Sequence, residues 1–337
     1  MPGEVNARFD RRGLFYCDDA LAAALAEIYG LTAVPLPLND PAGPVHAYRV
    51  KRPGTSRIIL APFNFQPVLA PRNEEIVRRI VRLAEGGPVG TSARVKLHHR
   101  LSDDLVGELG LSCASDGIET LVSLEGGGDA VMARMRPRHR SKLRAVRGAC
   151  AAAELTVVPF SEGQNLEAFY RILVEAYRDK HAMLPQPFSL FRALCRHDTG
   201  TRRAVGYAAV DRTSGEMAGG IIVLRDELQW CYAWGANRAA SASLEIGTYL
   251  IGHALDEAVA AGAAVFSLGL SAASQDDLRR YKRGWGGEEH EVLSYGWREE
   301  VRAVDLHRDF ALMRKVLRVM PTSLIRAVSP LAVRWLV

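Results

Sequence analysis

The chain contains few cysteines and no long apolar run. Its five cysteines are scattered over 337 residues and form no Cys-x-x-Cys pair, so we expect reduced, mostly structural thiols, no disulfide framework and no metal site. No apolar run approaches the roughly 18 residues of a membrane-spanning helix. The first apolar stretch, 20–27, is short and Ala-rich and does not resemble a signal peptide. We therefore expect a cytoplasmic protein, placed at the inner face of the membrane if it contacts one.

Neither sign of charge dominates, and aromatic residues make up only 7% of the chain. Charged residues reach 24% and the net charge is +5, which is ordinary for a soluble protein. A modest basic excess favours anionic partners such as phosphates, RNA or a membrane surface, and it says nothing about fold. Apolar residues make up 48% of the chain, enough for one large or two medium cores; for this length we expect two.

The order of helical and strand patterns is similar in the two halves of the chain. The first half has a hairpin, a helix, a strand, a helix and a strand; the second has two helices, three antiparallel strands, a helix, a strand, a helix and a strand. This predicts an α+β fold made of two similar units, each with a mixed, mostly antiparallel sheet flanked by helices. We place the units at 1–136 and 137–300, with a helical tail at 301–337. A single undivided sheet would count against the acyl-transfer interpretation that this division supports.

The stretch 263–290 is the most informative part of the chain. Val265, Phe266 and Leu268 lie in a short apolar run that stops at Gly269, which predicts a buried strand closed by a turn. A short basic helix that carries Lys282 follows. A strand that ends in Gly beside a helix that aims a Lys at the same place can form a site. The alternative is that this Lys is an ordinary solvated charge.

Residues 134–147 hold seven Arg or Lys and no acid. Leu143, Val146 and Cys150 fall on one helical stripe, so the segment can pack and still expose its basic face. It is either a solvated helix between two domains or a cationic surface for phosphate or tRNA. The surface would consist of Arg138, Arg140, Lys142 and Arg144.

The tail, 308–337, carries six basic residues and one acid. Its apolar residues recur at helical spacing, which predicts amphipathic helices. Either the tail packs across the two domains, or it lies on anionic lipid as a peripheral membrane contact.

The order of elements in the second half resembles the N-acetyltransferase (GNAT) fold, and the whole chain resembles the FemAB-like, or BioF2-like, acyltransferases, which carry two such units in tandem. The resemblance covers nearly the full length and depends on the order of several short motifs. These are Pro62-Phe63 before 68–71, the basic run 138–144, the segment 184–188, Phe266-Ser-Leu-Gly269 followed by Tyr281-Lys282-x-x-Trp285-Gly286, and the tail segments 317–321 and 329–330.

The chain departs from the family in several ways. Pro62-Phe63 lacks the expected Gly-rich continuation, and no heptad run for the coiled-coil arm of the peptidoglycan-bridge enzymes is present. Two further departures concern the implied site. The family strand reads Phe-Asp-Phe-Gly, whereas Ser267 and Leu268 stand here, so a carboxylate present in some members is missing. The Gly-containing pyrophosphate loop of acetyltransferases is also absent, because 237–243 contains no Gly. The second departure weakens a simple acetyl-CoA assignment.

The resemblance implies a set of site residues. Lys282 would neutralise a phosphate or a leaving ribose oxygen, and Tyr232 would lie beside the opening between two splayed strands; an aromatic side chain in the core is the alternative for Tyr232, and a structural role is the alternative for His181. The implied catalytic residues are Lys282 and Tyr232, and the substrate contacts are Tyr177, Arg178, His181 and Tyr281. The donor contacts would be Asn237, Arg238, Ser241 and Ser243, because the loop 237–243 precedes a helix whose N–H groups and dipole suit a donor phosphate. An ordinary capped helix is the alternative for this loop.

The sequence thus predicts an acyltransferase that forms an amide on a small-molecule or glycan amine, such as a cell-envelope polysaccharide precursor or a natural product. The donor would be an acyl-CoA or an aminoacyl-tRNA, used as a co-substrate, with no permanently bound cofactor. A third hypothesis, consistent with the loss of the strand carboxylate at Ser267, is a degenerate GNAT-fold binding module without catalysis.

Overall fold

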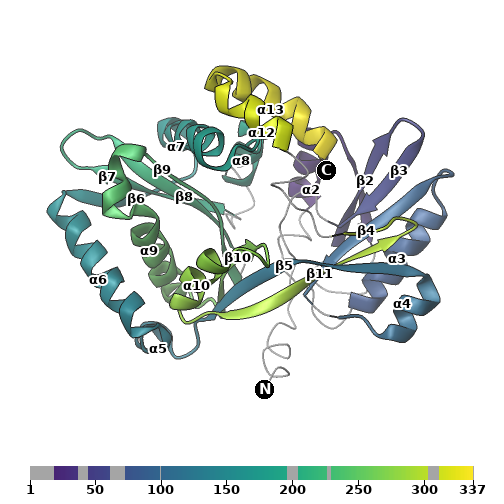
Figure 1. The fold of residues 1–337 in the computed structure, drawn as a ribbon, viewed down its shortest axis with the longest axis horizontal. Helices are drawn as coiled ribbons and strands as arrows, with labels where there is room; N and C mark the ends of the chain where they lie inside the picture. The colour runs from purple at the N-terminus through teal and green to yellow at the C-terminus, as the bar shows by residue number, and fades with distance from the viewer. Residues whose placement is uncertain are drawn as a thin grey trace.

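The computed structural model describes residues 19–36, 45–60, 73–98, 100–195, 204–225, 229–302 and 311–336. Helices and strands form two halves on either side of a long central ribbon (Figure 1). The motif that begins at Pro62-Phe63 lies outside the described residues, as does the beginning of the tail at 308–310.

The first half alternates helices and strands, and the sequence explains most of their ends. Gly110 adopts φ 62° and ends α4, because a left-handed residue after the last helical turn suits Gly. The elements are α2 (Asp19–Tyr29), β1 (Thr32–Leu36), β2 (Val45–Arg52), β3 (Thr55–Ile59), α3 (Asn73–Glu85), β4 (Thr91–Leu97), α4 (Asp103–Leu109), β5 (Leu111–Ser123) and α5 (Gly127–Arg134).

The second half begins with the basic helix, whose first position is the proline that helix starts favour. The elements are α6 (Pro137–Ala152), β6 (Leu155–Phe160), α7 (Gly163–Ala176), the π-turn η2 (Tyr177–His181), α8 (Phe188–Cys195), β7 (Ala204–Asp211), β8 (Met217–Arg225), β9 (Gln229–Asn237), the 3-10 turn η3 (Ala239–Leu244), α9 (Ile246–Ala260), β10 (Val265–Ser271), α10 (Asp276–Gly284), β11 (Glu288–Trp297), α12 (Ala311–Val319) and α13 (Thr322–Leu336).

The described strands form one sheet, in the order β1-β2-β3-β4-β11-β5-β10-β9-β8-β7-β6. The pairs β3–β4 and β9–β10 are parallel, and the other pairs are antiparallel. Each half therefore has the mixed, mostly antiparallel sheet that the sequence predicts. The two sheets are not separate, however, because the halves exchange a strand. β11 of the second half pairs with β4, and β5 of the first half pairs with β10.

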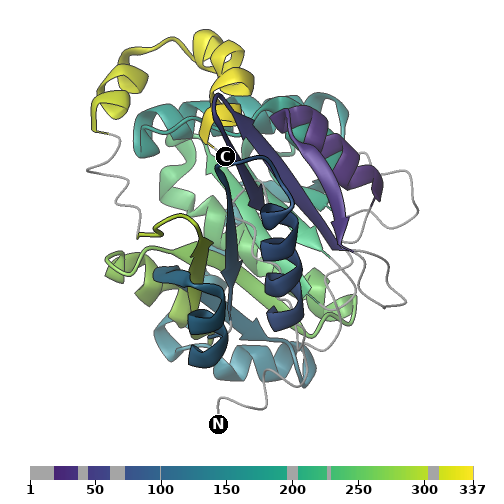
Figure 2. The ribbon, with the colours of Figure 1, turned by 90° about the vertical axis from the view of Figure 1, so that its right-hand side faces the viewer.

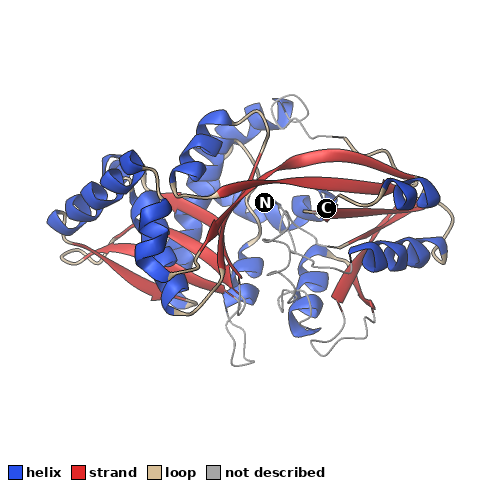
Figure 3. Cartoon of the chain, turned by 90° about the horizontal axis from the view of Figure 1, so that it is seen from below, coloured by secondary structure: helices blue, strands red, loops and turns tan. Residues whose placement is uncertain are grey.

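The exchanged strands β5 and β11 form a long two-stranded ribbon. They pair antiparallel from Glu288↔Leu121 to Trp297↔Leu111. β4 joins β11 at one end of the ribbon, through 293–297, and β10 joins β5 at the other end, through 118–123. Figure 3 shows these long strands running from one half to the other. The sequence analysis did not anticipate this exchange. It joins the strands of both halves into one 11-stranded sheet, with the strands of each half on either side of the ribbon.

Two apolar clusters pack against the faces of the sheet. The larger cluster spans both halves and includes side chains from α2, α3, α7 and α8. Tyr29 of α2 donates a hydrogen bond to Gln186 Oε1 at 2.7 Å, across the same boundary. The smaller cluster includes Val122 of β5 and otherwise side chains from α5, α6, α9 and α10 and the strands beneath them. Because one core is shared, the halves are packed together and not merely linked.

The tail helix α13 covers the boundary between the halves. It packs on α2 and on α7, and the yellow helix lies beside the purple and teal ones in Figure 2. Ile325 and Val333 of α13 are buried. Arg334 Nε donates to the Ile28 carbonyl of α2 at 3.1 Å. The inner face of the tail thus packs across both halves. Within the described ranges, no helix is both long and apolar enough to cross a bilayer.

Candidate functional site

The strands β9 and β10 run side by side for three residues and then part. Val265, Phe266 and Ser267 pair in parallel with Gln229, Trp230 and Cys231, and no β9–β10 pair follows. β9 carries an extra residue at this point, since Ile222 pairs with Trp234 and Val223 with Tyr232. β10 also shifts its register against β5 between Ser267 and Leu270. Such bulges re-aim side chains and end strand pairing, so both strands turn away from each other here.

The side chain of Lys282 lies at this point of separation. It is only 6% exposed, and Nζ donates hydrogen bonds to the carbonyls of Gly269 at 2.7 Å and Leu270 at 3.1 Å. Burial lowers the pKa of Lys282 to about 8, although Cys231 and Glu119 favour its charged form. The alternative that this Lys is a solvated charge is therefore wrong. An ammonium has three N–H groups, and two are used on the backbone, which leaves one for a ligand.

Aromatic packing holds the end of α10 that carries Lys282. Trp285 is fully buried, and its ring centroid lies 4.5 Å from that of His139, which stands in the first turn of α6. A Cβ built at Gly284 would lie 2.6 Å from His139 Nδ1, so only Gly fits between the two helices. The spacing Lys-x-x-Trp-Gly thus anchors the helix on one side and aims the Lys at the other.

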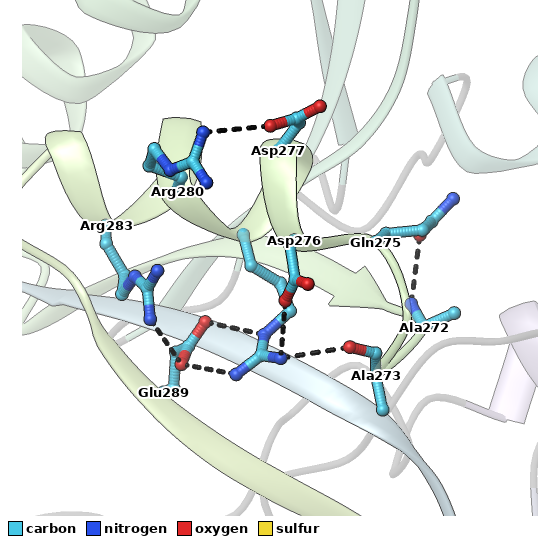
Figure 4. Close-up of polar contacts among 9 residues, drawn as sticks. Ala272, Ala273, Gln275, Asp276, Asp277, Arg280, Arg283 and Glu289 are labelled. Atoms are coloured by element: carbon cyan, nitrogen blue, oxygen red, sulfur yellow. Dashed lines mark hydrogen bonds and ion pairs between the residues drawn. The ribbon is translucent and has the colours of Figure 1, made fainter.

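The outer side of α10 is tied to its surroundings by ion pairs (Figure 4). Arg279 Nη2 and Arg283 Nη1 lie 2.9 Å and 3.3 Å from Glu289 Oε2 on β11. In the loop before the helix, Ala272 N–H donates to Gln275 Oε1 at 2.9 Å. These contacts join the helix to the strand that follows it and close the turn that precedes it, so the direction of Lys282 is fixed from outside as well.

Three of the predicted tyrosines come together near this place. Burial raises the pKa of Tyr232, and the neighbouring phenols Tyr281 and Tyr177 raise it further. A Cβ at Gly235 would lie 2.3 Å from the Tyr232 hydroxyl oxygen, so the ring lies along its own strand over Gly235. Tyr281 Oη shares a hydrogen bond with Thr248 Oγ1 at 3.2 Å. Tyr177 opens the π-turn η2, a form that often marks functional sites.

The predicted donor loop, 237–243, runs from the last residue of β9 into the 3-10 turn η3, which leads into α9. Glu245 stands at the N-terminus of this helix with φ 49°, and its carboxylate lies 2.6 Å from Lys142 Nζ. Asn237, with its amide oriented to suit its neighbours, accepts from Gly247 N–H at 3.3 Å. Arg238 Nη1 lies 3.6 Å from Glu216. The chain's own oxygens therefore already lie at the first amides of the helix.

The other predicted contacts lie in two places. Arg178 of η2 pairs with its neighbour Asp179, with 2.6 Å between Nε and Oδ1. His181 ends the same turn, and its side chain lies outside what the structure describes. On α6, Arg140 Nη1 donates to the Met132 carbonyl at 3.1 Å.

The cationic surface predicted on α6 is thus smaller than expected. Lys142 pairs with Glu245 and Arg140 with the backbone. Arg138 and Arg144 are exposed, and neither pairs with another described side chain. Two of the four predicted cations are therefore available to a large anionic partner.

The sequence analysis missed a buried carboxylate beside Lys282. Glu119 of β5 is only 3% exposed; Ser267 donates a short hydrogen bond to its Oε1, and His98 Nε2 lies 2.8 Å from its Oε2. Burial alone would raise the pKa of Glu119, but His98, Ser267 and Lys282 together lower it, so the group is ionised. A signal was present, because Glu119 is the one acid in the apolar strand pattern 118–124.

Comparison with known proteins relates this arrangement to one superfamily. Residues 133–283 match the family described as the acetyltransferase (GNAT) domain. The solved structure of FemX is similar, with a TM-score of 0.64 and 12% identity over 92% of this chain and 98% of that one. L-PGS from Bacillus licheniformis is similar, with a TM-score of 0.60 and 11% identity over 95% and 98%. No curated protein matches the chain in sequence.

Proposed function

We propose that this chain is a FemAB-like member of the GNAT superfamily and an acyltransferase that forms an amide on an amino-bearing acceptor, an interpretation supported by the family match over 133–283 and by the fold it shares with FemX. The observation that carries the proposal is the buried ammonium of Lys282 where β9 and β10 part, with one N–H unused. There it would stabilise the negative charge that develops on a leaving phosphate or ribose oxygen, an effect that is strong when water is excluded. A cell-envelope polysaccharide precursor or a natural product supplies the amine.

We favour aminoacyl-tRNA over acyl-CoA as the donor, for two reasons. At the start of α9, Gly247 N–H already donates to Asn237, and Glu245 stands at the helix N-terminus, so a pyrophosphate would find this anion site occupied by the chain's own groups. Arg138 and Arg144 on α6 are exposed and available to a polyanion. Contacts from Asn237, Arg238, Ser241 and Ser243 to the donor, and from Tyr177, Arg178, His181 and Tyr281 to the acceptor, complete the proposed site.

Thermal shift separates the donors. We expect charged tRNA to raise the melting temperature more than uncharged tRNA, and CoA thioesters to raise it little. Binding to tRNA should weaken steeply as salt increases, because phosphate contacts release counterions. Stabilisation by a CoA thioester alone would select the other donor. If neither class of donor is bound or consumed, the degenerate binding module is the better description.

The role of Lys282 is tested by Lys282→Ala. We expect transfer from the bound donor to fall by at least about a hundredfold, as for loss of one charge-stabilising donor, with the fold intact by circular dichroism. Arg280→Ala is the matched control, since Arg280 is exposed on the same helix and pairs only with Asp277 at 2.9 Å. Full transfer by Lys282→Ala would remove the basis of the proposal.

We also propose that α12 and α13 rest on anionic lipid through their outer face. Residues 311–336 contain basic residues and no acid. Four of the six large apolar side chains exposed among the described residues lie here: Val316, Val319, Leu324 and Leu331. A basic helix with exposed apolar residues suits an interfacial position.

A further inference from the structure

Glu119 lies where the two halves of the chain meet. It belongs to β5, between β10 and β11, and its register partners are Leu270 on one side and His290 on the other. His98, just after β4, brings Nε2 to 2.8 Å from the carboxylate. A carboxylate from the first half thus reaches the turn of β10 in the second half.

Two hydrogen bonds connect Glu119 with the place where Lys282 binds. Ser267, which is fully buried, donates to Glu119 Oε1, and the same hydroxyl oxygen accepts from Gly269 N–H at 3.0 Å. The carbonyls of Gly269 and Leu270 in turn accept from Lys282 Nζ. Gly269 has φ 75°, a conformation that L side chains rarely adopt. The carboxylate therefore helps to fix the irregular turn whose two carbonyls hold the ammonium.

Stability alone is a weak reason for a charge in this position. Burying an ionised carboxylate is costly, and a well-packed apolar group is often neutral or better for stability. Several polar atoms of the same neighbourhood, among them His98 Nδ1, His290 Nε2 and Ser271 Oγ, have no hydrogen-bond partner among the described residues. A partly unsatisfied buried network of this kind is expected where polar groups serve a reaction.

We propose that Glu119 is a positioning residue that orients Lys282 through Ser267 and the Gly269–Leu270 turn. The proposal rests on the proposed role of Lys282. It also gives the first half of the chain a part in the reaction, because the stretch that matches the GNAT family, 133–283, contains Ser267 and Lys282 but not Glu119 or His98. The site is incomplete without both halves.

The charged and titratable groups that face Lys282 and Glu119 determine how loss of the Glu119 charge would change the pKa of Lys282. Glu119 from β5 and Cys231 from β9 both act on Lys282, and both raise its pKa against the effect of burial. Glu119 is faced by His98 near β4, by His290 on β11 and by Ser267 on β10. Removal of the negative charge in Glu119→Gln should lower the pKa of Lys282 further, since the Glu119 carboxylate favours the charged form of the amine.

The test measures the titration of Lys282 in the full chain without any substrate. Trace acetylation with acetic anhydride from pH 6 to 10, followed by mass spectrometry of the Lys282 peptide, gives a labelling midpoint, with the exposed Lys180 as internal reference. In Glu119→Gln we expect the midpoint to fall by about one pH unit. Glu291→Gln is the matched control, because Glu291 is exposed on the same ribbon. It should leave the midpoint in place.

An unchanged midpoint in a folded Glu119→Gln protein overturns the inference. If that variant does not fold, Glu119→Ala combined with Ser267→Asp carries the test, since it returns one acid to this site from the neighbouring strand. Its midpoint should equal that of the wild type; a midpoint lowered by a unit despite the new acid would overturn the inference as well. Loss of the proposed function is a separate result, because it is read from transfer by Lys282→Ala and not from this titration.

Discussion

At the scale of single residues, the contact between Gly284 and His139 decides how α10 sits on α6. The two helices approach so closely that a Cβ at Gly284 would lie 2.6 Å from His139 Nδ1. Burial against this contact also lowers the pKa of His139 to about 4, with Lys142 adding to the effect, so the imidazole is neutral. A change here displaces the helix that carries Lys282, although neither residue touches the ammonium.

We expect Gly284→Ala to destabilise the protein by about 1–3 kcal/mol, the usual cost of overpacking a core. The measurement is urea unfolding followed by tryptophan fluorescence. The control is Gly148→Ala on α6, where a Cβ meets nothing within 4 Å; there we expect stabilisation of about 0.5–1 kcal/mol from helix propensity. The double variant His139→Ala/Gly284→Ala should recover part of the loss. Equal effects of the two Gly substitutions would show that the close approach is unimportant.

The sequence singles out Lys282 as a candidate site residue, but it does not reveal which side chains surround it. The apolar run before Gly269 and the basic helix after it point to one place, and both lie close together in the chain. Glu119 lies 148 residues from Ser267, and no local pattern reports a contact over that distance. The resemblance to the family draws attention to a carboxylate that is missing at Ser267. Only the three-dimensional arrangement shows that the neighbouring strand β5 brings a carboxylate to the Ser267 hydroxyl.

At the scale of elements, most helices and strands follow from periodicity, and the misses have physical reasons. β1 contains Pro35 and lies at an edge of the sheet, where a missing N–H is tolerated, so its sequence favours a loop as much as a strand. β6 follows the basic helix with only Ala153 and Glu154 between, and Glu154 has φ 54°. Because Glu154, and not Gly, adopts the left-handed conformation between α6 and β6, the sequence contains no signal for the end of α6.

The tail helices make a prediction at the same scale. In flotation with vesicles of phosphatidylglycerol and phosphatidylcholine, we expect the full chain to bind, and Val319→Asp/Leu331→Asp to bind at least about tenfold more weakly, since the two side chains are 81% and 64% exposed. Binding should require the anionic lipid and fall with salt.

The matched control for the tail is Val89→Asp. Val89 is 99% exposed on the loop before β4, so it changes the same chemistry elsewhere on the surface. It should leave flotation unchanged. Equal loss in the control, or binding to neutral vesicles alone, would contradict the lipid proposal. Self-association of the wild type that both tail substitutions abolish would instead show that a second copy covers this face.

At the scale of the whole molecule, the two halves depend on each other. β5 of the first half lies between β10 and β11, and β11 of the second half pairs with the side of β4 that faces away from β3. The mixed, mostly antiparallel strands of each half could be predicted from the order of elements, because each half has its own periodic pattern. The exchange could not, since a strand's own residues do not tell which of two similar sheets it joins.

We expect residues 133–337 alone to be insoluble or aggregated, because removal of β5 exposes the edges of β10 and β11. When 1–132 and 133–337 are produced together, the fragments should copurify as a 1:1 complex. The measurement is size-exclusion chromatography with light scattering. A soluble, monomeric 133–337 with a cooperative melting transition would show that the second half folds alone and that the exchange is dispensable.

The order in which the ribosome makes the chain gives the exchanged strands a further consequence. β4 is complete at residue 97, but its neighbour β11 ends only at residue 297, and the tunnel holds back the newest residues for longer still. The nascent first half therefore waits, through some 200 residues of translation at about 5–20 residues per second, with one side of β4 uncovered. Cells that make this protein must shield that side during synthesis, so its yield should depend on chaperones that bind nascent chains.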